Sequence, residues 1–343
     1  MSLHLLPYRI ILFSCFLLIG SYSCQENPPT NAAINNIPVD SVTIWINKSK
    51  DQSLTREEKK FFLDKANTLL LENESDSTMP KNLGRLSLGY LRINDDGKFK
   101  EVNDQLILLT IAKSDSTRLA NAYWDRGLFY ERNSVMDSAF ISYVKAHNIF
   151  IDLDHKKNAA KLLRNMAVIQ NNVRDYVQGE INLVKAIALF KELDDSKNLY
   201  KSYNSLGITV SNLKNYEEAL EYYNEALAFL NASDPDEKFR LRLINNMGMA
   251  HLDNGELEKA GEYFSQVINL KHAYSIDPAT YGRDLTNLGI TKVKQGGVNE
   301  KPIEYEKAIF VLDANEDYAG LSKTLFALAE YYTLTGDSTK AIE

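Results

Sequence analysis

Side chains that could carry catalysis or hold a metal are few and scattered in this sequence. The histidines are His4, His147, His155, His251 and His272. No two of them have the spacing with which metal ligands share one helix face, and no cysteine lies near them. Patterns for phosphate-binding loops, dinucleotide-binding turns and hydrolase nucleophiles do not occur either. We therefore predict that these residues form no enzyme and bind no metal or cofactor.

Basic side chains, in contrast, recur along the chain at a fixed interval. One asparagine and five cations stand 40 or 41 residues apart, at Asn121, Lys161, Lys201, Arg242, Arg283 and Lys323 (the basic row). Amides recur four residues after some of these positions, at Asn165, Asn246 and Asn287 (the amide row). Aliphatic side chains recur three residues after the amide position, at Leu128, Val168, Ile208, Met249 and Ile290 (the aliphatic row). Three such rows would suit an acidic protein or peptide segment with hydrophobic anchors. The alternative is that the lysines and arginines are ordinary solvated residues.

A second set of columns indicates which elements carry these rows. Small residues recur at Gly127, Ala167, Gly207, Gly248, Gly289 and Ala329. Twelve residues after each of them the chain has Ala139, Gly179, Ala219, Ala260, Lys301 and Ala341. Sixteen residues after them stand Tyr143, Leu183, Tyr223, Phe264 and Tyr305. Mostly apolar residues one and four positions before each small residue add the stripe of an amphipathic helix. Each unit is therefore predicted to be two antiparallel helices that approach closely where small residues face large ones.

These columns resemble the tetratricopeptide repeat over residues 114–343. The resemblance implies an all-α fold, a right-handed α-α superhelix (a solenoid) of about six helical hairpins whose first helices line the concave face. The interval of 40 or 41 residues exceeds the family's usual length of about 34. It is similar to long bacterial and kinesin-light-chain-like repeats. Members of the family bind peptide or protein segments. Their carboxylate-binding groove is not expected here, because the aliphatic row occupies the position of its asparagine.

The start of the chain predicts export. Ile10–Gly20 is an apolar run of eleven residues behind Arg9, too short to span a bilayer and typical of a secretory signal. Cys24 stands where a bacterial lipobox places its acylated cysteine, and GSYSCQEN resembles a lipoprotein signal of the Bacteroidota type. We therefore predict a signal peptide over 1–23 and a lipid anchor at Cys24. The mature chain would be periplasmic or anchored to the outer membrane of a Gram-negative bacterium. The alternative is an ordinary signal peptide, with Cys24 incidental.

Between the signal and the repeats we predict two further regions. Residues 24–52 begin with a stretch rich in asparagine and proline and are expected to form a flexible tether. Residues 53–113 are expected to be helical. Thr55 and Glu58 have the spacing of a capping box at the start of a helix. The end of this region, residues 83–113, is a possible degenerate repeat, as terminal units of such arrays often are.

The array over 114–343 is not uniform towards its end. Lys301 replaces a small residue in the fifth repeat, which predicts looser packing there. The sixth repeat has a complete first helix at about 317–334, but its second helix stops within 338–343. Helices this short are unstable alone. We therefore expect that the natural chain continues beyond Glu343 or that the sequence is a fragment.

Binding is the class of function that remains. The formal net charge of −7 argues against nonspecific nucleic-acid binding. The leading hypothesis is a noncatalytic envelope module that binds a protein or peptide segment, as the sensory or recruiting part of a larger signalling protein, such as a histidine kinase or a helix-turn-helix regulator. A free-standing lipoprotein scaffold for envelope assembly is the alternative. Glycan capture is a third hypothesis, and it needs exposed aromatic platforms, for which Trp45 and Trp124 are the only tryptophans.

Overall fold

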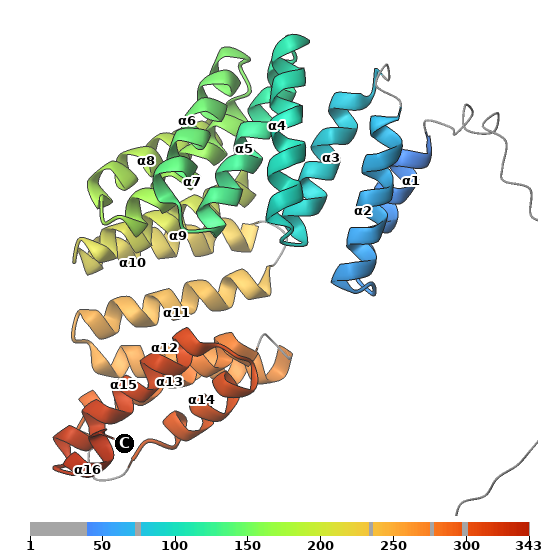
Figure 1. Cartoon of the computed structure of the whole chain (residues 1–343). Helices are drawn as coiled ribbons and strands as arrows, with labels where there is room; N and C mark the ends of the chain where they lie inside the picture. Colours follow the sequence, from blue (N-terminus) through green and yellow to red (C-terminus); the bar gives the residue numbers. More distant parts are fainter. Residues whose placement is uncertain (1–39, 73–76, 233–235, 275–277, 297–300, 343) are drawn as a thin grey trace, which may run out of the picture.

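A computed structural model describes residues 40–72, 77–232, 236–274, 278–296 and 301–342. These residues contain sixteen α-helices and no strand, so the prediction of an all-α fold is confirmed (Figure 1). The N-terminal helices are α1 (Asp40–Lys48), α2 (Arg56–Leu71), α3 (Met79–Arg92) and α4 (Asp96–Ala112). Six hairpins follow: α5 (Ser116–Arg132) with α6 (Met136–Asp152), α7 (Lys156–Asn172) with α8 (Tyr176–Glu192), α9 (Ser196–Asn212) with α10 (Tyr216–Ala232), α11 (Glu237–Asp253) with α12 (Leu257–Tyr274), α13 (Pro278–Lys294) with α14 (Ile303–Ala314), and α15 (Tyr318–Leu334) with α16 (Ser338–Ile342).

The small and aromatic columns meet inside each hairpin, as predicted. In the third hairpin the ring of Tyr223 on α10 lies directly against Gly207 on α9, and a Cβ atom on Gly207 would stand only 2.5 Å from the tyrosine Cε1. Tyr143 lies in the same way against Gly127 in the first hairpin. Tyr223 is almost fully buried. The glycine column is therefore required for close approach of the two helices, since any side chain there would displace the aromatic ring.

The hairpins stack into a curved array with the first helices on the inside. The first helices are α5, α7, α9, α11, α13 and α15, and α7 contacts α9, α9 contacts α11, α11 contacts α13, and α13 contacts α15. Successive second helices make no comparable contacts in the described part of the chain. Elements whose consecutive copies touch must lie on the shorter, inner side of a curved stack. The prediction that the first helices line the concave face is confirmed.

From α3 to α10 the turns between helices are nearly identical within and between hairpins. A residue with positive φ recurs every twenty residues at Asn94, Ser114, Ser134, Asp154, Arg174, Asp194 and Lys214. At the end of α3, the Asn94 N–H donates to the Leu91 carbonyl (3.2 Å) and the Asp95 N–H donates to the Tyr90 carbonyl (3.0 Å). This pair of bonds is a Schellman motif. The Asp95 carboxylate then accepts from the Lys98 N–H and caps the next helix, so one residue ends α3 and begins α4.

Helices α3 and α4 form the degenerate repeat expected at 83–113, and its columns are polar. Ser87 stands forty residues before Gly127, and Asn103 stands forty residues before Tyr143. The Asn103 amide donates to the Ser87 hydroxyl (3.3 Å) and to the Ala122 carbonyl (3.1 Å). Both side chains are fully buried. A hydrogen-bonded pair thus replaces the glycine–tyrosine contact, which is why the small and aromatic columns stop before this repeat.

The flexible tether predicted for residues 24–52 extends too far towards the C-terminus, because a helix begins at Asp40. Residues 40–48 form α1, which is amphipathic and buries Val42 and Ile46 against the helices that follow. The Asn- and Pro-rich composition ends just before this helix, and apolar periodicity takes over. Residues 24–39 and the signal, including Cys24, lie outside the described residues. The capping box is confirmed, because Thr55 accepts from the Glu58 N–H and Glu58 accepts from the Thr55 N–H.

The last two hairpins differ from the others in the length of their second helices, and the fifth still buries Tyr305, Ala308 and Leu312. Helix α14 has only twelve residues, begins after Lys301 and is shorter than α13. The Lys301 amine pairs with Glu306 (2.6 Å) instead of packing inside the hairpin. In the sixth repeat, α16 has five residues and leaves Leu325 of α15 48% exposed. Among the described helices, none is long and apolar enough to cross a membrane.

Candidate functional site on the inner face of the array

A pocket lined by four cations opens on the inner face, between the N-terminal halves of α7, α9 and α11. Its volume is about 420 Å³, and we call it the basic pocket. Its walls are Arg164, Lys201, Asn204, Ser205, Asp236, Lys238, Phe239 and Arg242. Two members of the predicted basic row, Lys201 and Arg242, are therefore brought together by the structure. Asp236 is the single carboxylate in the lining, and it already caps α11 by accepting from the Phe239 N–H (3.0 Å).

Aromatic rings and an amide hold these cations in place. The Lys201 amine lies 5.9 Å from the ring centroid of Tyr200, and the Arg242 guanidinium lies 5.8 Å from that of Phe239. The two rings contact each other edge to face, with centroids 4.6 Å apart. Arg164 donates to the Asn198 side-chain oxygen over 3.2 Å. Cations over aromatic faces keep their charge available to a ligand while their position is fixed.

The electrostatics of the pocket favour an anion. Burial lowers the pKa of Lys201, and the neighbouring Arg164 and Lys197 lower it further. Burial also lowers the pKa of Lys161, which stands beside the pocket, with Lys157 adding to the effect. None of the four cations that line the pocket forms an ion pair with another of the described residues. Like charges gathered without ion-pair partners repel one another, and a bound anion would lower the free energy of the site.

Three other members of the basic row are already bonded to other residues of the array, Arg283 to the next repeat, Lys323 to the preceding one and Asn121 within its own helix. Arg283 makes a two-pronged ion pair with Asp317, the N-cap of α15, with distances of 2.6 and 2.7 Å. The Lys323 amine donates to the Asn287 side-chain oxygen over 2.9 Å. In the first repeat, the Asn121 amide donates to the Thr117 carbonyl of its own helix. The basic row is therefore not one continuous strip of available cations.

The amide row joins neighbouring first helices. Asn246 on α11 donates to Asn204 on α9 (2.9 Å), and Asn287 on α13 donates to Asn245 on α11 (3.2 Å). The hydrogen-bond network assigns the orientation of the Asn165 amide, whose oxygen accepts from the Trp124 indole N–H (3.2 Å). Buried amides with satisfied partners fix the relative position of the helices that carry them. The amide row thus has a structural role, whatever else it contacts.

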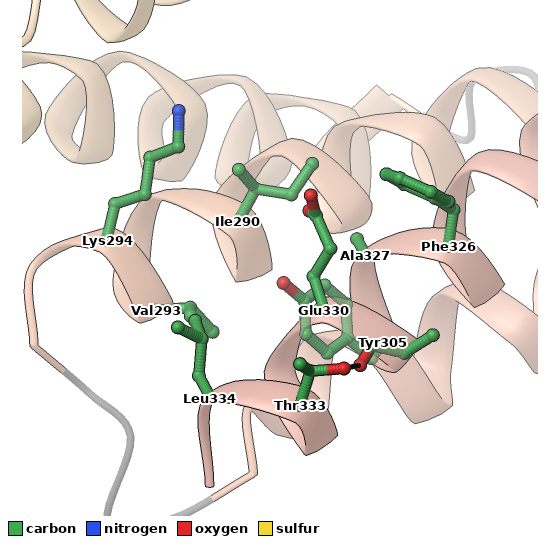
Figure 2. A pocket seen from close by; sticks show the side chains of 10 residues that line it. Ile290, Val293, Lys294, Tyr305, Phe326, Ala327, Glu330, Thr333 and Leu334 are labelled. Atoms are coloured by element: carbon green, nitrogen blue, oxygen red, sulfur yellow. Dashed lines mark hydrogen bonds between the residues drawn. The ribbon is translucent and has the colours of Figure 1, made fainter. Parts of the chain in front are cut away.

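The aliphatic row is half-buried, and at its end it lines a second, apolar pocket. Ile208 packs against the central core, and Met249 and Ile290 pack against the cluster around Phe264. Ile290 also lines a pocket of about 480 Å³ between the C-terminal halves of α13 and α15, which we call the apolar pocket (Figure 2). Its other lining residues are Val293, Lys294, Tyr305, Phe326, Ala327, Ala329, Glu330, Thr333 and Leu334. Phe326 and Leu334 are about two thirds exposed at its mouth, and buried Tyr305 forms its floor.

Clusters of metal-ligating side chains are absent from the described residues. Nowhere among them do three His, Cys, Asp or Glu side chains stand together so as to hold a metal ion. The recesses of the inner face include the basic pocket and the apolar pocket, which are built mainly on first helices. Such a surface can hold an extended or helical segment along its length.

Family models agree with the repeat geometry. Models of the tetratricopeptide repeat match residues 158–232 and 241–279, which lie within four of the hairpins described above. Residues 158–232 and 241–279 are tetratricopeptide repeats. No curated protein matches its sequence.

Solved structures share the fold of this helical array at low sequence identity. The signal-transduction ATPase PH0952 from Pyrococcus horikoshii, described as having a tetratricopeptide repeat sensor, has 16% identity and a TM-score of 0.64 over 83% of this chain and 44% of its own. A Rap protein complexed with competence and sporulation factor has 14% identity and a TM-score of 0.61 over 88% of both chains. NprR in complex with its cognate peptide NprX has 16% identity and a TM-score of 0.58 over 88% and 86%.

Several residues of the two pockets were not predicted from the repeat pattern. Arg164 and Phe326 share one column, three residues before the small residue, but that column contains no regular residue type. Lys238 and Phe239 lie in the first turn of α11, where the interval between repeats lengthens to 41 residues. A search for cations on neighbouring first helices, instead of within one column, would have found Arg164.

Proposed function

We propose that this tetratricopeptide array is a noncatalytic module that binds a protein or peptide segment on its inner face. The observation that carries the proposal is the basic pocket, where Arg164, Lys201, Lys238 and Arg242 converge. None of these four cations forms an ion pair with another described residue, and gathering like charges in this way costs free energy that a bound anion would offset. Acidic side chains of the bound segment are the groups that fit this pocket.

The apolar pocket provides the second contact. It lies further along the same row of first helices, and its lining is largely aliphatic and aromatic. An exposed pocket of this size suits one or two apolar side chains. The proposed ligand is therefore an acidic segment with a hydrophobic anchor, placed so that its acidic part meets repeats two to four and its apolar part meets repeats five and six.

The solved complexes support a peptide or protein partner by analogy of fold. NprR holds its cognate peptide, Rap holds competence and sporulation factor, and PH0952 is described as a sensor. At identities of 14–16% these similarities concern the fold alone. The chemical class of the ligand is therefore argued from the residues that line the basic pocket and the apolar pocket of this chain.

We further propose that the module works in the bacterial envelope, held by an acyl group on Cys24, in a sensory or recruiting role. The apolar run at Ile10–Gly20 and the motif around Cys24 support this location. Expression of the Cys24→Ser variant should release the protein from the membrane fraction. Unchanged fractionation, with no lipid on Cys24 by mass spectrometry, would contradict the anchor.

Selection from a phage library of random dodecapeptides tests the binding site. The wild-type protein should enrich peptides that combine Asp or Glu with Leu, Ile or Phe, and enriched peptides should bind more weakly as salt rises. The double variant Lys201→Glu, Arg242→Glu should lose at least about tenfold in affinity for them, since buried charge contacts contribute ~2–5 kcal/mol.

A matched control reverses two exposed lysines on second helices, Lys185→Glu and Lys307→Glu. These changes alter the net charge equally but leave the basic pocket intact, so affinity should change little. Equal losses in both double variants would show that only net charge matters. Enriched peptides without acidic residues would exclude the proposed ligand class.

A further inference from the structure

An exposed aromatic patch lies on the N-terminal helices, away from both pockets. It consists of the exposed side chains of Ile44 and Phe61 and the half-buried rings of Trp45 and Phe62, on α1 and α2 at one end of the array (Figure 1). Ile44 is 49% exposed and Phe61 is 59% exposed. Trp45 stacks on Phe62 with centroids 5.5 Å apart, and Phe61 contacts Phe62 edge to face. The outer face of a terminal repeat is normally polar, because no further repeat covers it. This terminal face is aromatic instead.

Lysines surround the aromatic patch. The Lys48 and Lys65 amines lie 4.4 and 4.2 Å from the ring centroid of Trp45. Lys48 and Lys50 also line a recess with Ile44, Leu54 and Phe62, whose other lining residues are Asn47 and Asp51. Tryptophan and phenylalanine flanked by lysine are the composition that prefers the boundary between lipid headgroups and acyl chains. The amines can meet anionic headgroups while the rings enter the interface.

The position of the patch in the chain points to the same partner. Helix α1 begins at Asp40, sixteen residues after Cys24. An extended segment of that length spans at most roughly 55 Å, so an acyl group on Cys24 would keep the patch close to the bilayer. Weak contact then suffices, because the anchor makes it an intramolecular event. We propose that the aromatic patch docks on an anionic lipid surface and orients the array on the membrane. This inference rests on the proposed lipid anchor.

Fluorescence quenching tests the docking directly. The Trp124→Phe variant leaves Trp45 as the single tryptophan. The acylated protein is reconstituted into vesicles of phosphatidylethanolamine and phosphatidylglycerol, with or without brominated acyl chains. Docking should reduce Trp45 emission by roughly half in the brominated vesicles, since interfacial side chains lie within ~5–10 Å of the acyl boundary. Adding Ile44→Ser and Phe61→Ser should abolish the quenching while flotation with the vesicles persists.

Phe310→Ser is the matched control, because Phe310 is 77% exposed on α14, at the other end of the array. It should leave the quenching unchanged, and circular dichroism should show equal helicity in all variants. Protein that floats with the vesicles but shows no quenching of Trp45 would overturn the docking and leave the anchor standing. Quenching that survives Ile44→Ser and Phe61→Ser would overturn it as well. Absence of lipid on Cys24 would overturn the anchor together with the docking.

Discussion

The Asn246 side chain on α11 donates a hydrogen bond over 2.9 Å to the Asn204 side chain on α9, so two successive first helices are joined through their amides. Asn204 is 5% exposed. Removing the donor would leave its oxygen buried without this partner. We expect Asn246→Ala to lower the free energy of unfolding by about 1–2 kcal/mol in urea denaturation. In a double-mutant cycle with Asn204→Ala the two losses should not add, because both remove the same bond. Additive losses would show that the amides act independently.

The contact between Gly207 and Tyr223 predicts a steric effect. A methyl group on Gly207 would lie 2.5 Å from the tyrosine ring, so the two helices of the hairpin must separate or the ring must turn. Gly207→Ala should therefore destabilise the protein by about 1–3 kcal/mol, measured by urea denaturation. Gly97→Ala is the control, because the nearest atom to its added Cβ is 3.9 Å away. That substitution should be neutral or stabilising, and an equal loss at both glycines would contradict the steric explanation.

The turn after α9 contains Lys214 with a φ of 65°, which is unfavourable for a residue with a Cβ. Glycine adopts this conformation without strain. We expect Lys214→Gly to raise the free energy of unfolding by about 0.5–1 kcal/mol. Lys214→Ala keeps the Cβ and should change stability little. A gain of the same size for alanine would mean that loss of the lysine charge, and not backbone strain, is responsible.

Asp195 predicts a pH dependence at the start of α9. Burial would raise its pKa, but the Lys157 amine (2.7 Å), the Asn198 side chain and the Asn198 N–H outweigh burial and hold the pKa below its ordinary value of 3.8. The stabilisation is therefore complete above pH 3.8 and is lost as the pH falls towards the lower folded-state value. Asp195→Asn should cost about 1 kcal/mol at neutral pH. The difference from wild type should shrink in urea denaturation at about pH 3.

Asp194→Asn provides the comparison one residue earlier. Asp194 is exposed and lies in the turn, where asparagine tolerates the positive φ equally well. Its replacement should have little effect at either pH. A loss at Asp195 that stays constant down to acidic pH would show that the carboxylate charge is not the stabilising feature.

The hairpins could be predicted from the sequence because their packing depends on single residues that recur at a fixed interval of 40 or 41 residues. Gly207 opposite Tyr223 is visible as a spacing of sixteen residues, and that spacing leads to close helix packing. Ser87 and Asn103 have the same spacing of sixteen residues, but they meet through a hydrogen bond instead of the close contact of a glycine with an aromatic ring. A search for small and aromatic residues therefore detects repeats only from Gly127 onwards and misses the earlier repeat formed by α3 and α4. Helix α1 was missed because the preceding composition is that of a tether.

The candidate site was predictable only where neighbouring repeats do not interfere. Lys201 and Arg242 reach the basic pocket as their column suggests. Arg283 belongs to the same column, but Asp317 from the following turn pairs with it. The amide row is likewise committed to bonds between helices. A column describes one position on one helix, whereas availability to a ligand depends on the side chains that the next helix brings.

The repeated turn geometry affects how such an array can change its length. From Asn94 to Lys214 every joint has the same backbone form at an interval of twenty residues. A cut at one joint therefore fits a cut at any other. Duplicating or deleting two helices would preserve the alternation of inner and outer helices. It would lengthen or shorten the concave surface by one first helix. Gaining or losing a single helix would fit the turns equally well. In every later hairpin, however, the second helix would then take the inner position of the first. The uniform joints thus permit insertions and deletions by pairs of helices, while the different faces of the two helices in each pair oppose changes by one.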